Sequence, residues 1–310
     1  MVTQYGVQTA GDYDKVLQVA RWAERRGLVS FALPDHYLPS TRGDRAAEPV
    51  QDAFAQLAGL ARETSNIRLA MLVSPITFRH PAVLAKNAVT IDAMSGGRFS
   101  LGVGTGWLEA EHDLFGIPFP SRRERFDRLE EALAYLRASF SAEAPGFQGD
   151  YYQLAPQVVA PHPSSTFHLV VGGMGARRTP ELAGRYADEY NVYPAPPAEM
   201  AERIARARAA ADEAGRDPDR LLISSSGAVL VGHDEADYQD RLATLAASVG
   251  ATVEELEEHF APRNTPRGSA DEVKEQLAEM EAIGVERFYV QALYGPEIPP
   301  IEETLTLLGA

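Results

Sequence analysis

An acid–histidine pair follows one of the short apolar runs of the chain. The run VSFALP at Val29–Pro34 is followed directly by Asp35, His36 and Tyr37. Histidine gives up or takes a proton near neutral pH, and a neighbouring carboxylate can orient its ring. We therefore interpret Asp35 and His36 as candidate acid–base residues. A loop-capping pair without chemistry is the alternative.

A glycine-rich stretch followed by two arginines marks a second candidate site. Residues 172–178 read GGMGARR and follow the apolar run HLVV. Glycines let successive backbone N–H groups converge on an anion, and a helix beginning near Thr179 adds the positive end of its dipole. We interpret residues 172–178 as a phosphate-binding loop, in which Gly173, Met174, Gly175 and Ala176 offer backbone and both Arg177 and Arg178 add positive charge. A surface turn with solvated arginines is the alternative.

Three alternating glycines, Gly102, Gly104 and Gly106, lie in the run RFSLGVGTGW. A dinucleotide fingerprint needs the spacing G-x-G-x-x-G, and Trp107 occupies the place of its last glycine. The pattern instead indicates a strand whose backbone closely approaches a flat ligand or another strand. Packing inside a barrel is the alternative. Trp107 is a candidate pocket wall, or else a core aromatic residue.

The acidic run that follows Trp107 has the residue types of a metal site but not the spacing. Glu109, Glu111, His112 and Asp113 lie close together. No acid stands four residues from His112, which is the helical spacing that places two ligands on one face. We expect a solvated acidic face here, and no metal.

The elements that must position these residues alternate between short apolar runs and longer helical patterns. Eight strand candidates, each followed by a helix, predict a parallel sheet closed into a (β/α)8 TIM barrel; an open doubly wound sheet is the runner-up. We expect one domain over residues 1–310, with insertions at approximately 141–165 and 250–268. The first insertion contains GDYYQLAP, which is typical of a small hairpin.

Local signals support the predicted helices. The pattern YDKVLQVARWAERRG predicts a helix that stops at Gly27, and Pro81 suits the first turn of a helix capped by His80. The run LLISSSGAVLVG is expected to be a single strand. In a barrel, active sites gather at the C-terminal ends of the strands. Polar and aromatic residues follow several of the predicted strands: Asp35–Tyr37, Val73–Ser74, Thr105–Trp107, Gly173–Arg177 and Tyr193.

The composition excludes several classes of function. The 310 residues include 44 acidic and 29 basic side chains, giving a net charge of −15, which argues against a nucleic-acid partner. The chain has no cysteine, so thiolate catalysis and disulfides are excluded. No apolar stretch approaches the ~18 residues of a membrane span. We expect a cytoplasmic protein that acts on a small molecule.

Taken together, three stretches resemble the luciferase-like family of flavin- and deazaflavin-dependent oxidoreductases. They are PDHY at Pro34–Tyr37, the run Val73–Phe119 that contains SGGRFSLGVGTGW, and LVVGGMGARRTPELAGRYADEYNVY at Leu169–Tyr193. The resemblance extends from Tyr5 to about Val290. The form of SGGRFSLGVGTGW and the Asp–His pair are similar to the branch that uses coenzyme F420.

The resemblance implies a TIM barrel, usually dimeric, that binds F420, with FMN as the alternative cofactor. It implies that Asp35 and His36 lie at the deazaflavin ring, and that Thr105 and Gly106 contact the polar edge of the ring. It also implies a strand bulge at Val73–Ser74, often with a non-proline cis peptide, and a phosphate held by Gly173, Met174, Gly175 and Arg177.

One residue departs from the pattern of the sugar-phosphate dehydrogenases of this branch. These relatives place a catalytic glutamate directly after GVGTG, where this chain has Trp107. We therefore expect hydride transfer between F420 and a small alcohol, ketone or activated double bond, in a pocket that includes Tyr37, Trp107 and Tyr193, with His36 moving the proton. The alternatives are an FMN-dependent monooxygenase with a partner reductase and a non-catalytic deazaflavin-binding protein.

Overall fold

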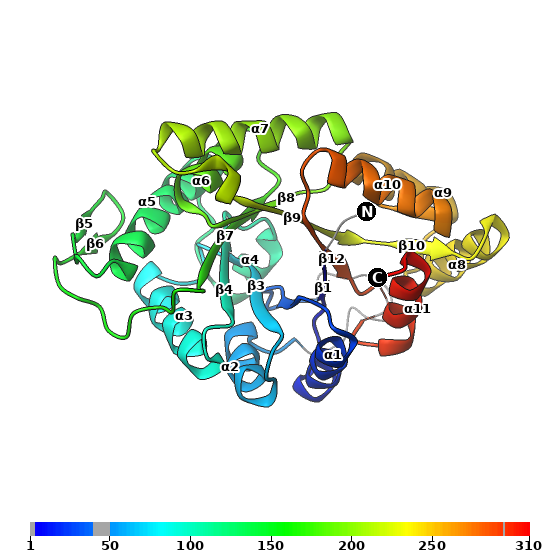
Figure 1. Cartoon of the computed structure of the whole chain (residues 1–310), viewed down its shortest axis with the longest axis horizontal. Coiled ribbons are helices and arrows are strands. Elements are labelled where there is room, and N and C mark those ends of the chain that lie inside the picture. Colours follow the sequence, from blue (N-terminus) through cyan, green and yellow to red (C-terminus); the bar gives the residue numbers. More distant parts are fainter. Residues whose placement is uncertain (1–3, 40–49, 294) are drawn as a thin grey trace.

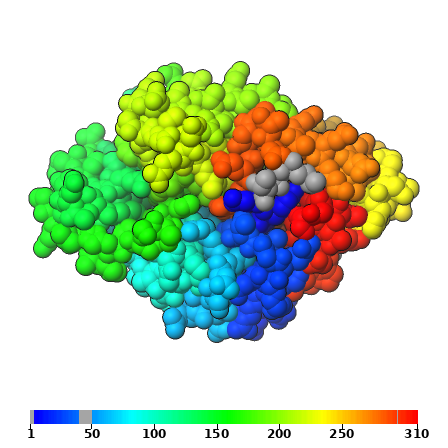
Figure 2. Space-filling model, viewed as in Figure 1, coloured from blue at the N-terminus to red at the C-terminus, as the bar shows by residue number. Residues whose placement is uncertain are grey.

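A closed barrel of eight parallel strands forms the centre of the molecule (Figure 1). The computed structural model describes residues 4–39, 50–293 and 295–310. In order around the barrel the strands are β1 (Gln4–Gln8), β12 (Arg287–Gln291), β9 (Leu222–Ala228), β8 (Glu189–Val192), β7 (His168–Gly173), β4 (Phe99–Gly104), β3 (Arg68–Pro75) and β2 (Ser30–Leu33). The predicted TIM barrel is confirmed, and the open sheet is wrong. β1 pairs with β12, so the N-terminal segment in blue meets the C-terminal segments in orange and red (Figure 2).

Helices surround the barrel and cover the outer faces of its strands. They are α1 (Tyr13–Arg26), α2 (Ala53–Glu63), α3 (Pro81–Ser95), α4 (Glu109–Phe115), α5 (Arg122–Phe140), α6 (Arg178–Tyr186), α7 (Pro197–Glu213), α8 (Glu235–Ser248), α9 (Val253–Phe260), α10 (Ala270–Ala282) and α11 (Ile298–Leu308), with short 3-10 turns at Pro218–Arg220 and Ala261–Arg263. Every residue of β2 and of β4 is buried, as expected for parallel strands covered on both faces. None of the helices in the described ranges has the length and hydropathy needed to span a bilayer.

The helix ends follow the sequence signals. Asp12 caps the start of α1, and Gly27 ends it at φ +85°, a conformation that glycine adopts without steric cost. His80 accepts a hydrogen bond from the backbone N–H of Ala82 at the start of α3, so its predicted capping role is confirmed.

Two small sheets lie outside the barrel at opposite ends of the long axis (Figure 1). At one end, β5 (Phe147–Gln148) and β6 (Gln153–Leu154) form a hairpin; its turn and second strand lie in GDYYQLAP, where a hairpin was expected, and its first strand precedes that stretch. At the other, β10 (Leu230–Gly232) pairs with β11 (Arg267–Ser269). The expectation of a single strand through LLISSSGAVLVG is therefore wrong. The chain leaves the barrel at Val229, and β10 packs with α8 and α9 in a separate apolar cluster.

The N-terminal end of the barrel contains a buried ion pair. Arg287 Nη1 of β12 lies 2.9 Å from Glu189 Oε2 of β8, and the Glu189 side chain is fully buried. Gln4 of β1 accepts a hydrogen bond from Arg287 Nη2 at 2.9 Å. Three strands that are distant in sequence are thus joined at the end of the barrel away from the candidate site.

Candidate active site

The barrel brings the predicted site residues to one end of five neighbouring strands. Asp35, His36 and Tyr37 follow β2, Val73 and Ser74 lie near the end of β3, and Thr105, Gly106 and Trp107 follow β4. Gly173 ends β7, with Met174, Gly175, Ala176 and Arg177 between it and α6, and Tyr193 follows β8. Because β2, β3, β4, β7 and β8 are adjacent and parallel, these segments share the C-terminal end of the barrel.

Glu111, rather than Asp35, holds the His36 ring. His36 Nδ1 lies 3.0 Å from Glu111 Oε1 and 3.1 Å from Oε2. Glu111 Oε1 also accepts hydrogen bonds from the backbone N–H groups of Tyr37 at 2.8 Å and Leu38 at 3.0 Å. The adjacent acid that the sequence suggested as a partner is therefore not in contact with the ring. The true partner is 75 residues away along the chain.

The expected solvated acidic face is wrong for two of its four residues. Glu111 and His112 are each 1% exposed, whereas Glu109 and Asp113 are exposed. α4 turns one side toward the barrel, and the His112 ring packs 5.0 Å from the Phe78 ring and 4.4 Å from that of Phe119. All four residues are polar, so the sequence could not indicate which of them the short helix buries.

The Glu111 carboxylate is ionised by its partners despite its burial. Burial raises the pKa of Glu111, but the His36 ring and the N–H groups of Leu38 and Tyr37 outweigh it and bring the pKa below its ordinary value. Hydrogen bonds to the charged form of a carboxyl have this effect. The residue is thus a fixed negative charge beside His36.

Asp35 belongs to a separate ionic network. Its carboxylate accepts a hydrogen bond from Ser74 Oγ at 2.6 Å and pairs with Arg79, which also reaches Asp52 at 2.7 Å. Burial raises the pKa of Asp35, and the Arg79 guanidinium and the Ser74 hydroxyl oppose the rise. Arg79 was missed by sequence reasoning because it stands in an ordinary helix approach, TFRHP, with no motif. Its role is to tie the loop after β2 to the end of β3.

The alternating glycines accommodate an irregularity of β3. The β3–β4 register shifts between Met71 and Ser74, and the Leu72–Val73 peptide is cis. A Cβ on Gly102 would lie 2.3 Å from Met71 O, and one on Gly104 would lie 3.0 Å from Val73 Cγ2. These two glycines therefore permit contact between strands, which was the packing alternative.

Two glutamines unrecognised in the sequence support the same irregular segment. Gln8 Nε2 of β1 donates to Leu72 O at 2.5 Å, and Gln291 Nε2 of β12 donates to Gln8 Oε1 at 2.8 Å. The irregular part of β3 is thus hydrogen-bonded to β1, and the same glutamine of β1 is held by β12.

The three aromatic residues predicted for the pocket make different contacts, and of these only Trp107 meets the His36 ring among the described residues. Tyr37 stacks on Phe78 with ring centroids 4.6 Å apart, and Trp107 meets His36 edge-on at 5.7 Å. Trp107 is 58% exposed, so it is not a core residue. The Tyr193 hydroxyl accepts a hydrogen bond from Arg263 Nε at 3.1 Å, which joins it to the expected insertion at 250–268.

The loop between β7 and α6 has open backbone and one largely exposed arginine. Gly173 has φ +149°, and a Cβ on Gly175 would lie 2.4 Å from Thr179 Oγ1, so neither position suits a larger residue. No side chain caps the start of α6. The Arg177 side chain is 80% exposed and lies 3.1 Å from Glu181. Arg178 instead points to Asp127 at 2.7 Å and Glu130 at 3.1 Å on α5.

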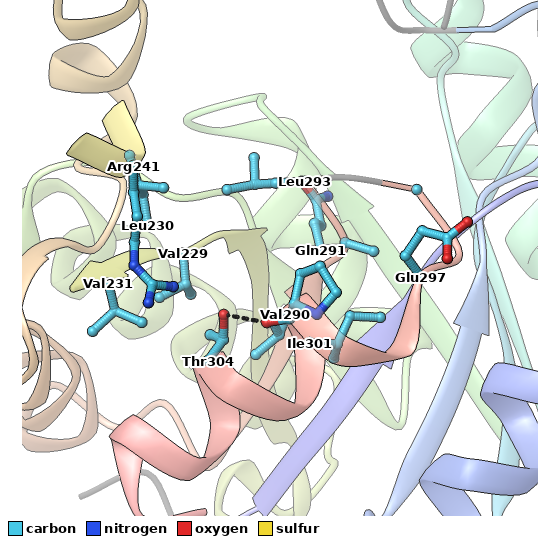
Figure 3. Close-up of a pocket in the computed structure, with 13 residues that line it drawn as sticks. Val229, Leu230, Val231, Arg241, Val290, Gln291, Leu293, Glu297, Ile301 and Thr304 are labelled. Carbon is cyan, nitrogen blue, oxygen red and sulfur yellow. Dashed lines mark hydrogen bonds between the residues drawn. The ribbon is translucent and has the colours of Figure 1, made fainter. Parts of the chain in front are cut away.

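A small cavity of about 30 Å³ lies elsewhere, between the end of β12, the strand β10 and helices α8 and α11 (Figure 3). Its wall is largely aliphatic, with Val229, Val231 and Ile301. Arg241 on its edge is bound to Glu303 and Asp237. None of the residues predicted for the active site lines this cavity.

Comparison with known proteins identifies the family of the chain and relatives that include an F420-dependent dehydrogenase and a monooxygenase. The family model described as luciferase-like monooxygenase matches residues 1–294. The chain is 35% identical to the F420-dependent glucose-6-phosphate dehydrogenase of Kineococcus radiotolerans over 179 residues, which is 57% of this chain and 51% of that protein. The match thus spans about half the length of this relative. The chain is also 28% identical to the pyrimidine monooxygenase RutA of Escherichia coli over 268 residues, which is 84% of this chain and 71% of that protein.

Solved structures with the same fold cover nearly the entire chain. An F420-dependent secondary alcohol dehydrogenase in complex with an F420–acetone adduct superposes with a TM-score of 0.79 at 22% identity, covering 99% of both chains. The F420-dependent tetrahydromethanopterin reductase of Methanopyrus kandleri gives a TM-score of 0.75 at 20% identity, covering 99% of this chain and 97% of that one. At these identities the likeness concerns the fold, while the family follows from the match over residues 1–294. The chain belongs to the luciferase-like monooxygenase family, whose members are oxidoreductases built on a TIM barrel.

Proposed function

We propose that this protein is an F420-dependent oxidoreductase that transfers hydride between the deazaflavin and a small organic substrate. The observation that carries the proposal is the His36 ring at the C-terminal end of the barrel, held through Nδ1 by the buried carboxylate of Glu111. This arrangement leaves Nε2 for proton transfer. The similarity to an F420-dependent dehydrogenase at 35% identity supports the choice of cofactor.

The residues between β7 and α6 fit the phosphate end of such a cofactor. The first N–H groups of α6 have no capping side chain, and Gly173 and Gly175 leave the backbone bare. A helix start of this kind favours an anion. Arg177, exposed beside the same loop, adds positive charge in a chain of net charge −15. Met174 and Ala176 would complete the cradle, while Thr105 and Gly106 would meet the ring of the cofactor.

The chain itself would orient the substrate, exclude water and move one proton. When bound, the deazaflavin supplies or receives hydride; the protein provides the surroundings for that chemistry. His36 Nε2 would take the hydroxyl proton as an alcohol is oxidised, or return a proton to the product when a ketone or an activated double bond is reduced. Asp35 would hold its loop through Ser74 and Arg79.

The aromatic surroundings favour a flat or apolar substrate. Trp107 meets the His36 ring edge-on and is 58% exposed, and an indole N–H cannot act as a base. A sugar-phosphate substrate is therefore disfavoured, although the relative from Kineococcus radiotolerans carries the name of a glucose-6-phosphate dehydrogenase. Tyr193, held by Arg263, would form the far side of the pocket.

An FMN-dependent monooxygenase that works with a partner reductase is the second candidate function. The match to the pyrimidine monooxygenase RutA favours it, because that match covers 84% of the chain. The same phosphate loop would serve FMN. A deazaflavin-binding protein without catalysis is a third reading. We further propose a homodimer, which sedimentation equilibrium would test.

Titration with each cofactor tests the proposal. Purified protein is titrated with F420 and with FMN while ring fluorescence is followed. We expect saturable binding of F420 and weak binding of FMN. Tight binding of FMN without affinity for F420 would overturn the F420 assignment. Binding of F420 without turnover of alcohols, enones or nitroaromatics would favour the third function, a deazaflavin-binding protein without catalysis.

Replacement of His36 tests the mechanism. His36→Ala is expected to lower kcat by about 10²- to 10⁴-fold, the usual contribution of a positioned acid or base, while F420 still binds. His162→Ala is the matched control, because His162 is exposed in the segment before β7. Full activity of the His36 variant would refute proton transfer by this residue.

A further inference from the structure

One buried carboxylate makes three hydrogen bonds to a single loop. Glu111 Oε1 accepts hydrogen bonds from the His36 ring at 3.0 Å and from the backbone N–H groups of Tyr37 at 2.8 Å and Leu38 at 3.0 Å. The residue is 1% exposed although it carries charge. A buried charge is costly unless it is fully hydrogen-bonded, so the contacts define one position for the loop.

We propose that Glu111 is the positioning residue of the site, and that it determines which nitrogen of His36 performs proton transfer. The proposal rests on the function proposed above for His36. An ionised carboxylate can only accept hydrogen bonds, so Nδ1 must carry the proton that points to Glu111. In the neutral ring, Nε2 is then the unprotonated nitrogen. Within the described residues, Nε2 makes no hydrogen bond.

The other charged groups near this loop cannot replace Glu111. Asp35 is engaged by Ser74 and Arg79, and the Arg79 guanidinium is shared with Asp52. The neighbouring histidine is also committed: His112 Nδ1 donates to Leu108 O at 2.9 Å, and its Nε2 lies 2.7 Å from Thr77 Oγ1. A carbonyl only accepts, so His112 carries its proton on Nδ1 and uses both nitrogens within the protein. His36 is left as the ring with one nitrogen available.

The β4–α4 segment supplies two constraints on His36 at once. Trp107 meets the ring edge-on at 5.7 Å, and Glu111, four residues later, holds Nδ1. Trp107 ends the glycine-rich run RFSLGVGTGW, and Glu111 lies in the acidic run that follows it. The position of β4 in the barrel thus sets the orientation of a catalytic group on the loop after β2.

The tautomer of His36 can be measured without cofactor or substrate. Long-range ¹H–¹⁵N correlation spectra of protein labelled at the histidine rings distinguish the two neutral tautomers, and the His36→Gln spectrum assigns the signals. We expect the Nδ1–H tautomer alone in the wild-type protein at alkaline pH. A wild-type ring that is Nε2–H, or a mixture of both forms, would overturn the proposal, and this outcome requires neither cofactor nor substrate.

A charge-neutral variant separates positioning from loop support. Glu111→Gln keeps an oxygen for the N–H groups of Tyr37 and Leu38 but can present either its oxygen or its amide N–H to the ring. We expect a mixture of tautomers and a fall in kcat of about 10- to 100-fold with little change in KM, by analogy with carboxylates that orient metal-binding histidines. Asp113→Asn, on the exposed side of α4, is the matched control.

An unchanged tautomer or an unchanged kcat in Glu111→Gln would refute the role of Glu111. The two proposals fail in different ways. Absence of F420 binding would overturn the proposed function and leave the tautomer result standing. A wild-type tautomer other than Nδ1–H would overturn the role of Glu111 whichever cofactor binds.

Discussion

Replacing Gly102 with alanine tests whether the glycines of β4 serve strand packing. A Cβ at this position would lie 2.3 Å from the backbone oxygen of Met71 and 2.8 Å from Val73 Cγ1. Met71 is paired with β4 in the barrel, so its carbonyl cannot rotate away as a flexible side chain would. The two strands would have to separate next to the register shift in β3.

The expected cost is about 2 kcal/mol. Forcing an extra methyl group into a close-packed interior costs roughly 1–3 kcal/mol, and the contact with backbone favours the upper part of this range. Alanine also restricts the unfolded chain more than glycine does, which raises the free energy of unfolding by about 0.4–1 kcal/mol and offsets part of this cost. For a chain of this size, 2 kcal/mol lowers the melting temperature by roughly 3 °C.

Gly227→Ala in β9 is the matched control. A Cβ at Gly227 would have Pro194 Cγ at 3.4 Å as its nearest neighbour, which is an ordinary contact. This variant is expected to unfold within about 1 °C of the wild-type protein, by the same entropy argument. Differential scanning calorimetry and circular dichroism measure the melting temperatures of Gly102→Ala and Gly227→Ala. Equal melting temperatures for the two variants would refute the packing role of Gly102.

Three further predictions concern other parts of the molecule. Arg287→Met is expected to destabilise the fold by about 3–5 kcal/mol in urea unfolding, because it leaves the fully buried Glu189 unpaired; a smaller loss than 1 kcal/mol would contradict this. Glu24 Oε1 accepts hydrogen bonds from three consecutive N–H groups at residues 65–67, and although burial raises the pKa of Glu24, these bonds lower it overall. Its stabilising effect is therefore present above its unfolded pKa and lost as pH falls through the lower folded value, so Glu24→Gln should be less stable by about 1 kcal/mol at pH 7 and equal to wild type near pH 2; a difference that persists in acid would contradict it. Arg177→Ala should weaken F420 binding by about tenfold at low salt and less at high salt, as fluorescence titration would show, whereas an unchanged affinity would remove Arg177 from the phosphate site.

Local order could be predicted well because it depends on neighbours along the chain. The alternation of apolar runs with helical patterns predicted the barrel, since parallel strands buried on both faces read as continuous apolar runs. Gly27 and His80 end and begin helices by contacts within a few residues. Where tertiary packing intervened, the prediction failed. The run LLISSSGAVLVG has uniform strand character, and only the pairing of β10 with β11 divides it at Val229.

In the candidate site, too, the positions of residues along the chain could be predicted, whereas their partners in space could not. The sequence by itself determined which residues gather at the C-terminal end of the barrel, because strand ends in a parallel barrel must share one side. It also showed that Trp107 directly follows GVGTG. Partnerships across the barrel were decided only by the tertiary structure. Asp35 and His36 are adjacent, yet one is held by Arg79 and the other by Glu111, because a hydrogen bond depends on distance in space and leaves no spacing rule in the chain.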